Sequence, residues 1–324
     1  MYSLRDRGYA VVPNFLSSDE CEELLALIDK VPTTPNCLSL KVMEAPEYIL
    51  EKFQGLLAQV ERETGIIADT NIVGNQSGDM ECDCARRCGV SPHSKRLATV
   101  WETDGKSKGT QNFHIDAGPR LLFENADDSL NFWVAIRKPN RDKAGLTLIP
   151  SDALAIADSG FEDLGFRIGG CQLKNGRHVF ESLDAEYPFV SDLDAISISP
   201  EMGPGDMLIM TSNVLHRTQD VSEGRVAISF RFDRSSNTLD IYDFVMCNLK
   251  IGTLKNKVGL LRVWHRLFPR VISLETYLQL RARSDEESAQ PRPFDPSFWI
   301  FLSKLRLKWI WKKVRAKMSK SAAL

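Results

Sequence analysis

Cysteine is scarce in this sequence, and no uninterrupted apolar run is long enough to span a membrane. The chain has 7 cysteines among 324 residues without a repeated framework, so we expect no disulfide scaffold and a reducing compartment. The absence of about 18 consecutive apolar residues argues against a membrane-spanning helix. The amino terminus carries Arg5, Asp6 and Arg7 and lacks the apolar core of a signal peptide. These absences favour a cytoplasmic protein.

Recognisable nucleic-acid-binding modules are also lacking, although charge is unevenly distributed along the chain. Hydrophobic residues make up 43% and charged residues 26%, which is typical of folded globular proteins. The net charge is -2, but residues 250–324 hold 17 Lys and Arg against 5 Asp and Glu, so the rest of the chain carries -14. We therefore divide the chain into an acidic body, residues 1–240, and a basic extension, residues 241–324.

The end of the extension combines positive charge with tryptophan. Residues 297–324 contain eight basic side chains, no acidic ones and three tryptophans, and a helix would align Phe298, Leu302, Leu305 and Trp309 in one stripe. This pattern predicts a helix lying on an anionic membrane surface, which would give peripheral membrane association. Packing against the acidic body or against a second copy is the alternative, and the sequence leaves the oligomeric state open.

The acidic body begins with helical patterns and continues with short strands. Ser17 and Glu20 form a capping-box pattern before an apolar periodic run, which predicts a helix start. A second helix is expected at residues 46–63, where it would cover a sheet. Short apolar segments separated by turn residues then predict a β core at about residues 95–235, as a barrel or sandwich. The expected strands are 97–102, 111–117, 130–137, 146–150, 194–200, 206–212 and 225–233.

Three residues of this β core could hold one metal ion. His114 and Asp116 lie two apart in an expected strand, so their side chains share a face. A structural hydrogen-bonded pair is the alternative for these two residues. Adding His216 supplies the two-histidine, one-carboxylate set that holds iron(II) on one side and leaves positions open.

The last expected strand alternates between two kinds of side chain. Arg225 begins it, and the period of two separates an apolar face from a polar one that could line a wet interior pocket. The apolar face would pack beneath helices. The apolar set is Val226, Ile228, Phe230 and Phe232, and the polar set is Arg225, Ala227, Ser229 and Arg231.

Several blocks, in this order, resemble the phytanoyl-CoA dioxygenase-like family of iron(II)/2-oxoglutarate oxygenases. They are GYAVVPNFLSSDECEELLALID, HIDAGP, LNFWVAIRKPNRDKAGLTLIPSDA and MGPGDMLIMTSNVLHRTQDVSEGRVAIS. The resemblance covers about residues 8–235 and excludes the basic extension. It implies a mainly β fold with flanking helices, whose core is a double-stranded β-helix of the jelly-roll or cupin-like type, followed by the helical, basic extension.

The same resemblance implies the roles of the site residues. His114, Asp116 and His216 would bind Fe(II), while Arg225 would pair with the distal carboxylate of 2-oxoglutarate, with Arg231 as the alternative arginine. Thr218 would contact the same carboxylate, and Trp133 would form an aromatic wall near the metal. The resemblance thus implies two sets of site residues. The catalytic, metal-binding set is His114, Asp116 and His216, and the cofactor-binding set is Arg225, Thr218 and Trp133.

The implied reaction consumes O2 and 2-oxoglutarate, releases succinate and CO2, and hydroxylates a C–H bond of a small-molecule, lipid, glycolipid or sugar-containing substrate. Asp116 favours hydroxylation, because the halogenating branch of the family lacks this carboxylate. The chain departs from many relatives in reading PSDA at residues 150–153, where they read PGSH. This difference leaves the substrate open.

Two other interpretations remain at this point. A non-catalytic peripheral membrane or scaffold protein could retain the same metal-binding barrel without turnover. Separately, Cys82, Cys84 and Cys88 with His93 invite a structural zinc site, although their spacing contains no C-x2-C pair, and unliganded loop cysteines are the alternative.

Overall fold

The computed structural model describes residues 2–32, 40–73, 88–91, 94–104, 112–115, 129–164, 169–182, 186–219, 223–240 and 271–279. The chain divides into two compact units, Met1–Asn237 and Thr238–Leu324. In the described part of the second unit, β13 (Thr238–Asp240) pairs with β14 (Val271–Ser273), and residues 274–279 are helical. Most of the basic extension lies outside the described residues, so its amphipathic helix and its membrane contact stay predictions, as does the functional division at residue 240.

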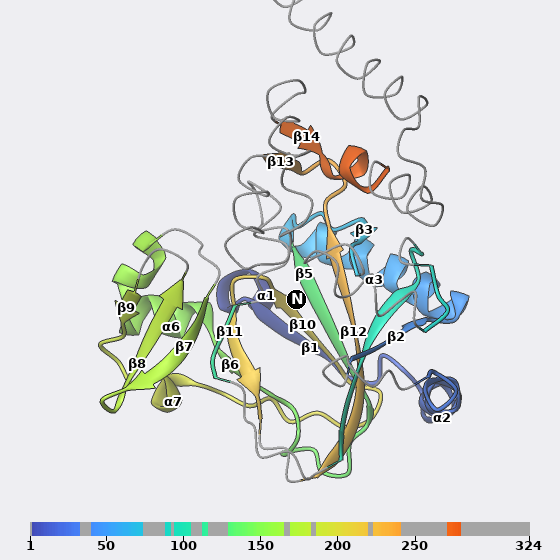
Figure 1. The fold of residues 1–324 in the computed structure, drawn as a ribbon, viewed down its shortest axis with the longest axis horizontal. Helices are drawn as coiled ribbons and strands as arrows, with labels where there is room; N and C mark the ends of the chain where they lie inside the picture. Colours follow the sequence, from blue (N-terminus) through green and yellow to red (C-terminus); the bar gives the residue numbers. More distant parts are fainter. Residues whose placement is uncertain are drawn as a thin grey trace, which may run out of the picture. The chain divides into compact units, whose positions relative to one another are not determined.

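The first unit is built on an antiparallel sheet whose central strands are β5 (Leu130–Arg137) and β12 (Gly224–Asp233), both buried along nearly their whole length (Figure 1). The strand order is β1-β10-β5-β12-β4-β2, and β3 also pairs with β12. Burial of both faces explains why β5 is almost continuously apolar, whereas β12 alternates apolar residues with the polar set that begins at Arg225. The remaining strands are β1 (Tyr9–Val12), β2 (Leu40–Glu44), β3 (Thr70–Asn71), β4 (Leu97–Asp104) and β10 (Met207–Thr211).

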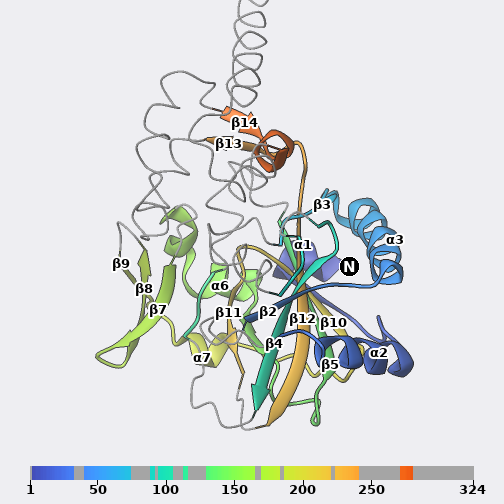
Figure 2. The same cartoon turned by 45° about the vertical axis from the view of Figure 1, so that its right-hand side comes forward.

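Helices cover one face of this sheet. α1 (Tyr2–Arg7) leads into β1, while α2 (Ser18–Ile28) and α3 (Glu47–Thr64) lie on the same side of the sheet (Figure 2). The predicted capping box is confirmed, because the Ser17 hydroxyl accepts from the Glu20 amide and the Glu20 carboxylate accepts from the Ser17 amide. The helix predicted at residues 46–63 is also confirmed within one residue at each end.

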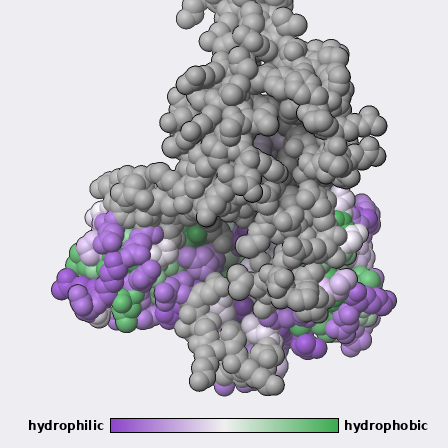
Figure 3. Space-filling model, viewed as in Figure 1, coloured by the Kyte–Doolittle hydropathy of each residue, from purple (hydrophilic) through white to green (hydrophobic). Residues whose placement is uncertain are grey.

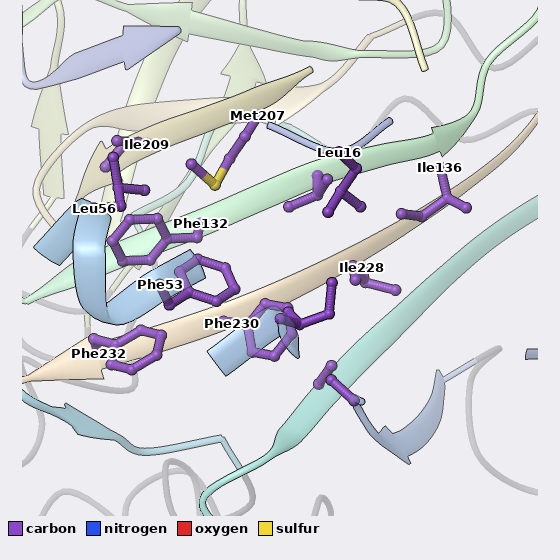
Figure 4. Packing of buried hydrophobic residues seen from close by; sticks show 14 of the residues in the cluster. Leu16, Phe53, Leu56, Phe132, Ile136, Met207, Ile209, Ile228, Phe230 and Phe232 are labelled. Carbon is purple, nitrogen blue, oxygen red and sulfur yellow. The ribbon is translucent and has the colours of Figure 1, made fainter. Parts of the chain in front are cut away.

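An aromatic cluster fixes α3 on the sheet. The ring of Phe53 inserts among sheet residues, with centroids 5.2 Å from Phe132, 4.6 Å from Phe230 and 5.4 Å from Phe232 (Figure 4). Phe53 and Phe230 are completely buried. Because each ring removes a large apolar area from water, this cluster is a major stabilising contact between the helices and β12.

The second layer brings distant segments together through residues 113 and 114. β11 (Leu215–Thr218) pairs with β6 (Leu146–Ile149), and β7 (Gly169–Lys174), β8 (Arg177–Ser182) and β9 (Glu186–Pro188) form a three-stranded sheet. His114 forms bridges to both Gly170 and His216, so it joins β7 to β11. Three short helices accompany this layer, namely α6 (Ser151–Ala157), the 3-10 helix η2 (Ser159–Leu164) and α7 (Leu193–Ile196).

The two faces of β12 behave as the alternation predicted. Val226, Ile228 and Phe230 pack in the cluster beneath the helices, whereas Ala227 packs with Trp133 in a second cluster. That second cluster also contains residues of β6, so it lies between the two layers. In its described part the first unit is therefore mainly β with flanking helices, consistent with a jelly-roll-like fold.

Two expected strands differ from the structure. In the strand expected at residues 111–117, the described residues 112–115 form no strand, and only His114 pairs, through isolated bridges. Residues 194–200 do not form a strand, because α7 occupies Leu193–Ile196 and its start is capped by the Asp192 carboxylate, which accepts from the Asp194 amide at 3.0 Å. Only Ile198 pairs, with Leu148 of β6. The local cap therefore overrides the apolar alternation of this segment.

The described residues that are coloured in Figure 3 show hydrophilic surface with separate hydrophobic patches. Among the helices that the structure describes, none combines the length and apolarity required to cross a bilayer.

Candidate metal centre

His114 and His216 meet as directly paired residues of neighbouring strands. The His114 amide donates to the His216 carbonyl at 2.9 Å, and the His216 amide donates to the His114 carbonyl at 3.0 Å. Their ring centroids lie 4.4 Å apart with an interplanar angle of 49°. The structure thus brings together two of the three predicted ligands, which are separated by more than 100 positions in the sequence.

Backbone contacts set the tautomer of both imidazoles. Nδ1 of His114 lies 2.9 Å from the Asn112 carbonyl, and Nδ1 of His216 lies 3.0 Å from the Val214 carbonyl. A carbonyl oxygen only accepts hydrogen bonds, so each Nδ1 must carry the proton. Nε2 of each ring then carries the lone pair, which is the arrangement found in metal-binding histidines.

The third predicted ligand, Asp116, lies outside the described residues, and its role stays a prediction. Ile115, the residue before it, is buried and packs in the cluster that contains Phe113. Two correctly protonated imidazoles fit a ferrous ion, and the sequence places a carboxylate two residues after the first of them.

A buried guanidinium occupies the interior face of β12. Only 4% of Arg225 is exposed. Its Nη1 donates to the carbonyls of Ala144 and Gly145, both at 2.7 Å, while its Nε has no hydrogen-bond partner. In the described part of the chain no carboxylate pairs with this cation. Because an unpaired buried charge is costly, the arrangement points to an anionic ligand that is held here.

Trp133 contributes an aromatic face beside the same guanidinium. The Arg225 Cζ lies 5.4 Å from the centroid of the indole ring, a cation–π distance. Trp133 is itself buried and shares a cluster with Leu148, which is the strand partner of His216. Burial lowers the pKa of Arg225 to about 10, so the guanidinium remains charged at neutral pH.

Gln219, the residue after Thr218, shares a hydrogen-bond acceptor with Arg225. The Gly145 carbonyl that accepts from Arg225 also accepts from the Gln219 amide at 3.0 Å, and the Gln219 side chain accepts from the Gly145 amide at 2.9 Å. Thr218 lies two residues after His216, so Thr218 and His216 share a face of β11. The contact of Thr218 with the carboxylate that Arg225 would bind stays a prediction.

Sequence reasoning missed Lys138, a second buried cation of this region. Its Nζ donates to the carbonyls of Arg141 at 2.6 Å and Met202 at 2.9 Å, and it lies beside Gly145. The pKa of Lys138 is lowered to about 8, chiefly by burial and in smaller part by the positive charge of Arg225. A lysine that follows an exposed arginine at a strand end carries no pattern that distinguishes it from a surface residue.

The depressed pKa of Lys138 predicts a pH-dependent stability. An unfolded lysine has a pKa of about 10.4, so the unfolded chain binds more protons between pH 8 and 10 and the free energy of unfolding rises with pH there. Lys138→Met removes this contribution. Between pH 7 and 10.5, we expect the free energy of unfolding of wild type to rise by up to about 3 kcal/mol relative to that of the variant. Urea unfolding of both proteins across this range measures the difference, and a constant difference would contradict the prediction.

A second group of candidate ligand atoms lies apart from the histidine pair. In the described ranges, ligand atoms of His178, Asp192 and Asp194 lie within 4.8 Å of one another. However, Asp194 is ion-paired with Arg217 at 2.6 Å, and Asp192 caps α7, so both carboxylates already have partners. The alternative zinc site cannot be placed, since Cys82, Cys84 and His93 lie outside the described residues.

Comparisons with known proteins return structural likenesses only. No protein-family profile matches the sequence, and no curated protein matches it. The epimerase SnoN, solved with Fe3+, alpha ketoglutarate and nogalamycin RO, is 14% identical with a TM-score of 0.44, covering 74% of this chain and 83% of SnoN. The alpha ketoglutarate dependent carbocyclase SnoK is 12% identical with a TM-score of 0.39, covering 74% and 84%. The non-heme monooxygenase ThoJ is 12% identical with a TM-score of 0.43, covering 71% and 75%. Scores this low leave the functional argument to the residues themselves.

Proposed function

We propose that this protein is an iron(II)- and 2-oxoglutarate-dependent oxygenase that hydroxylates a C–H bond of a small-molecule, lipid or sugar-containing substrate. Its core would be a double-stranded β-helix of the phytanoyl-CoA dioxygenase-like type. The observation that carries the proposal is the combination of a paired, Nδ1-protonated histidine couple with a buried guanidinium that lacks a carboxylate partner among the described residues. The histidine pair would bind a metal ion and the guanidinium would bind an anion. One keto-diacid bound to a metal would fill both sites.

The histidine pair supports the metal half of the proposal. Nε2 of His114 and Nε2 of His216 would bind the ion, and Asp116 would complete the set. Iron(II) held in this way would supply the redox chemistry that couples O2 to decarboxylation of 2-oxoglutarate. The chain's own contribution is orientation, because the backbone carbonyls of Asn112 and Val214 keep both rings in the required tautomer.

Arg225 supports the 2-oxoglutarate half. A planar guanidinium suits a carboxylate because it offers paired donors. Its Nη1 already donates to the carbonyls of Ala144 and Gly145, which fixes the guanidinium plane, while the buried Nε has no partner among the described residues. Thr218 would add a hydroxyl contact to the same carboxylate. Trp133 excludes water from one side of the guanidinium, which strengthens the ion pair.

The direct test is binding of both components by the purified full chain under anaerobic conditions. We expect Fe(II) together with 2-oxoglutarate to give a weak visible charge-transfer band that neither gives alone, and air to trigger succinate release. Screening candidate substrates for faster succinate release would then narrow the substrate class. Absence of the band after iron is restored would overturn the proposal. A band without succinate release from any substrate would favour the non-catalytic scaffold.

A further inference from the structure

The residues next to the two histidines form a closed group of side chains on the opposite side of their strands. Side chains alternate along a strand, so Phe113 and Arg217 point away from the face that carries His114 and His216. The Arg217 Cζ lies 4.3 Å from the centroid of the Phe113 ring. Each candidate ligand is thus covalently joined to one member of a stacked cation–π pair.

Two further residues close this group. Nη2 of Arg217 lies 2.6 Å from Oδ1 of Asp194, and Nε2 of His178 lies 3.8 Å from Oδ2 of the same carboxylate. The His178 ring meets Phe113 edge-on, with centroids 5.8 Å apart and an interplanar angle of 72°. We call Phe113, Arg217, Asp194 and His178 the clamp.

The clamp joins four elements that are distant in sequence. Phe113 belongs to the bridging segment, Arg217 to β11, Asp194 to α7 and His178 to β8. Asp194 is fixed in turn by the capped start of α7. Phe113 is 1% exposed, and its carbonyl accepts from the Cys171 amide of β7 at 2.6 Å.

The histidine pair joins two short extended segments. β11 contains 4 residues, and His114 is an isolated bridge residue that is not part of a longer strand. The Asn112 and Val214 carbonyls hold each ring to its own segment, and two backbone hydrogen bonds join the segments at His114 and His216. The clamp adds a second contact between the same segments, because the Arg217 guanidinium lies over the Phe113 ring while it is bonded to Asp194. We expect this contact to restrain the twist of one segment relative to the other.

We propose that Arg217 is a positioning residue, which sets the spacing of the two imidazoles through the clamp and thereby the affinity of the site for iron(II). The inference rests on the proposed function. It predicts that loss of the Arg217 guanidinium weakens iron binding although Arg217 does not touch the metal. Changes to residues that orient metal ligands cost about 10–100-fold in metal affinity.

The experiment compares Fe(II) affinity of wild type, Arg217→Gln and Arg217→Lys by anaerobic calorimetry on the full chain. We expect Arg217→Gln to weaken binding at least about 10-fold. The Fe(II) affinity of Arg217→Lys should lie between those of wild type and Arg217→Gln, because an ammonium group retains the charge opposite Asp194 and lacks the planar contact with Phe113. Asp194→Asn should resemble Arg217→Gln, and the double variant should lose no more than either single one, since all three disrupt one unit.

Arg96→Gln is the matched control, since Arg96 forms a comparable half-exposed pair with Glu44 at 3.1 Å, between β4 and β2. It should leave iron affinity unchanged, and the urea midpoint of each variant checks its fold. Wild-type iron affinity retained by Arg217→Gln would overturn the clamp while leaving the proposed function intact. Failure of wild type itself to bind iron would overturn the proposed function and the clamp with it. If Arg217→Gln does not fold, the Fe(II) affinity of Asp194→Asn is measured in its place. Wild-type affinity in that variant would likewise overturn the clamp.

Discussion

Replacing His216 by alanine is expected to reduce Fe(II)-dependent succinate release to the rate measured without iron. The imidazole is 6% exposed, and its tautomer is fixed by the Val214 carbonyl. Alanine removes a predicted metal ligand and retains the backbone pairing with His114, so the strand register should persist. Because changes in residues that merely support a ligand cost about 10–100-fold in metal affinity, loss of a ligand should cost more than about 100-fold.

The measurement is anaerobic Fe(II) titration followed by succinate quantification in air, with iron-free wild type as the background. Circular dichroism and the urea midpoint establish that the variant is folded. Retention of wild-type iron affinity by folded His216→Ala would remove this residue from the metal site. The predicted ligand set would then have to be abandoned.

Substituting Arg225 by methionine is expected to raise the dissociation constant of 2-oxoglutarate by roughly 100-fold or more. Breaking a buried ion pair by removing one partner costs about 3–5 kcal/mol, and each 1.4 kcal/mol is a factor of about ten. Iron affinity should change little, because Arg225 is not one of the predicted iron ligands. Calorimetric titration of 2-oxoglutarate into the Fe(II)-loaded protein measures the effect.

Arg231→Met is the matched control for this experiment. Arg231 lies on the same face of the same strand and was the alternative carboxylate partner, but it pairs in register with Asn131. Arg225 instead lies against Trp133 and the 144–145 carbonyls. A larger loss of 2-oxoglutarate affinity in Arg231→Met than in Arg225→Met would reverse the assignment.

The free energy of unfolding of the ligand-free protein separates two effects of the Arg225 charge. One is the cost of burying the charge, and the other is its contribution to binding 2-oxoglutarate. Without a ligand, the buried guanidinium is an unpaired charge, so Arg225→Met removes a desolvation cost while it takes one donor from each of two carbonyls. The Gly145 carbonyl keeps the Gln219 amide as a donor, so the Ala144 carbonyl is the one that loses its donor. These effects oppose each other, and the free energy of unfolding of the ligand-free variant should lie within about 1 kcal/mol of the wild-type value. Added 2-oxoglutarate should therefore stabilise wild type and leave the variant unchanged.

Local chemistry explains which features could be predicted from the sequence. The capping box at Ser17 and Glu20 and the apolar stripe of α3 are patterns of neighbouring residues, and both helices form where these patterns lie. The alternation in β12 is equally local, so the division into a helix-facing and an interior face was also predicted. The strand expected at residues 194–200 failed because the cap at Asp192 was not weighed against a short apolar alternation.

By itself, the sequence determined the mainly β character of the body, the faces of its strands and the residue types of the candidate site, because each depends on side chains close together in the chain. Only the tertiary structure decided that His114 pairs with His216, that Arg225 is the buried cation beside Trp133, and that Arg217 joins Phe113 to Asp194. Apart from the Arg217–Asp194 pair, these contacts join residues more than 80 positions apart, and they depend on a strand register that is fixed by how the whole core packs. The same reason hides Lys138 from sequence analysis, since its burial comes from the Arg141 and Met202 carbonyls that the fold brings to it.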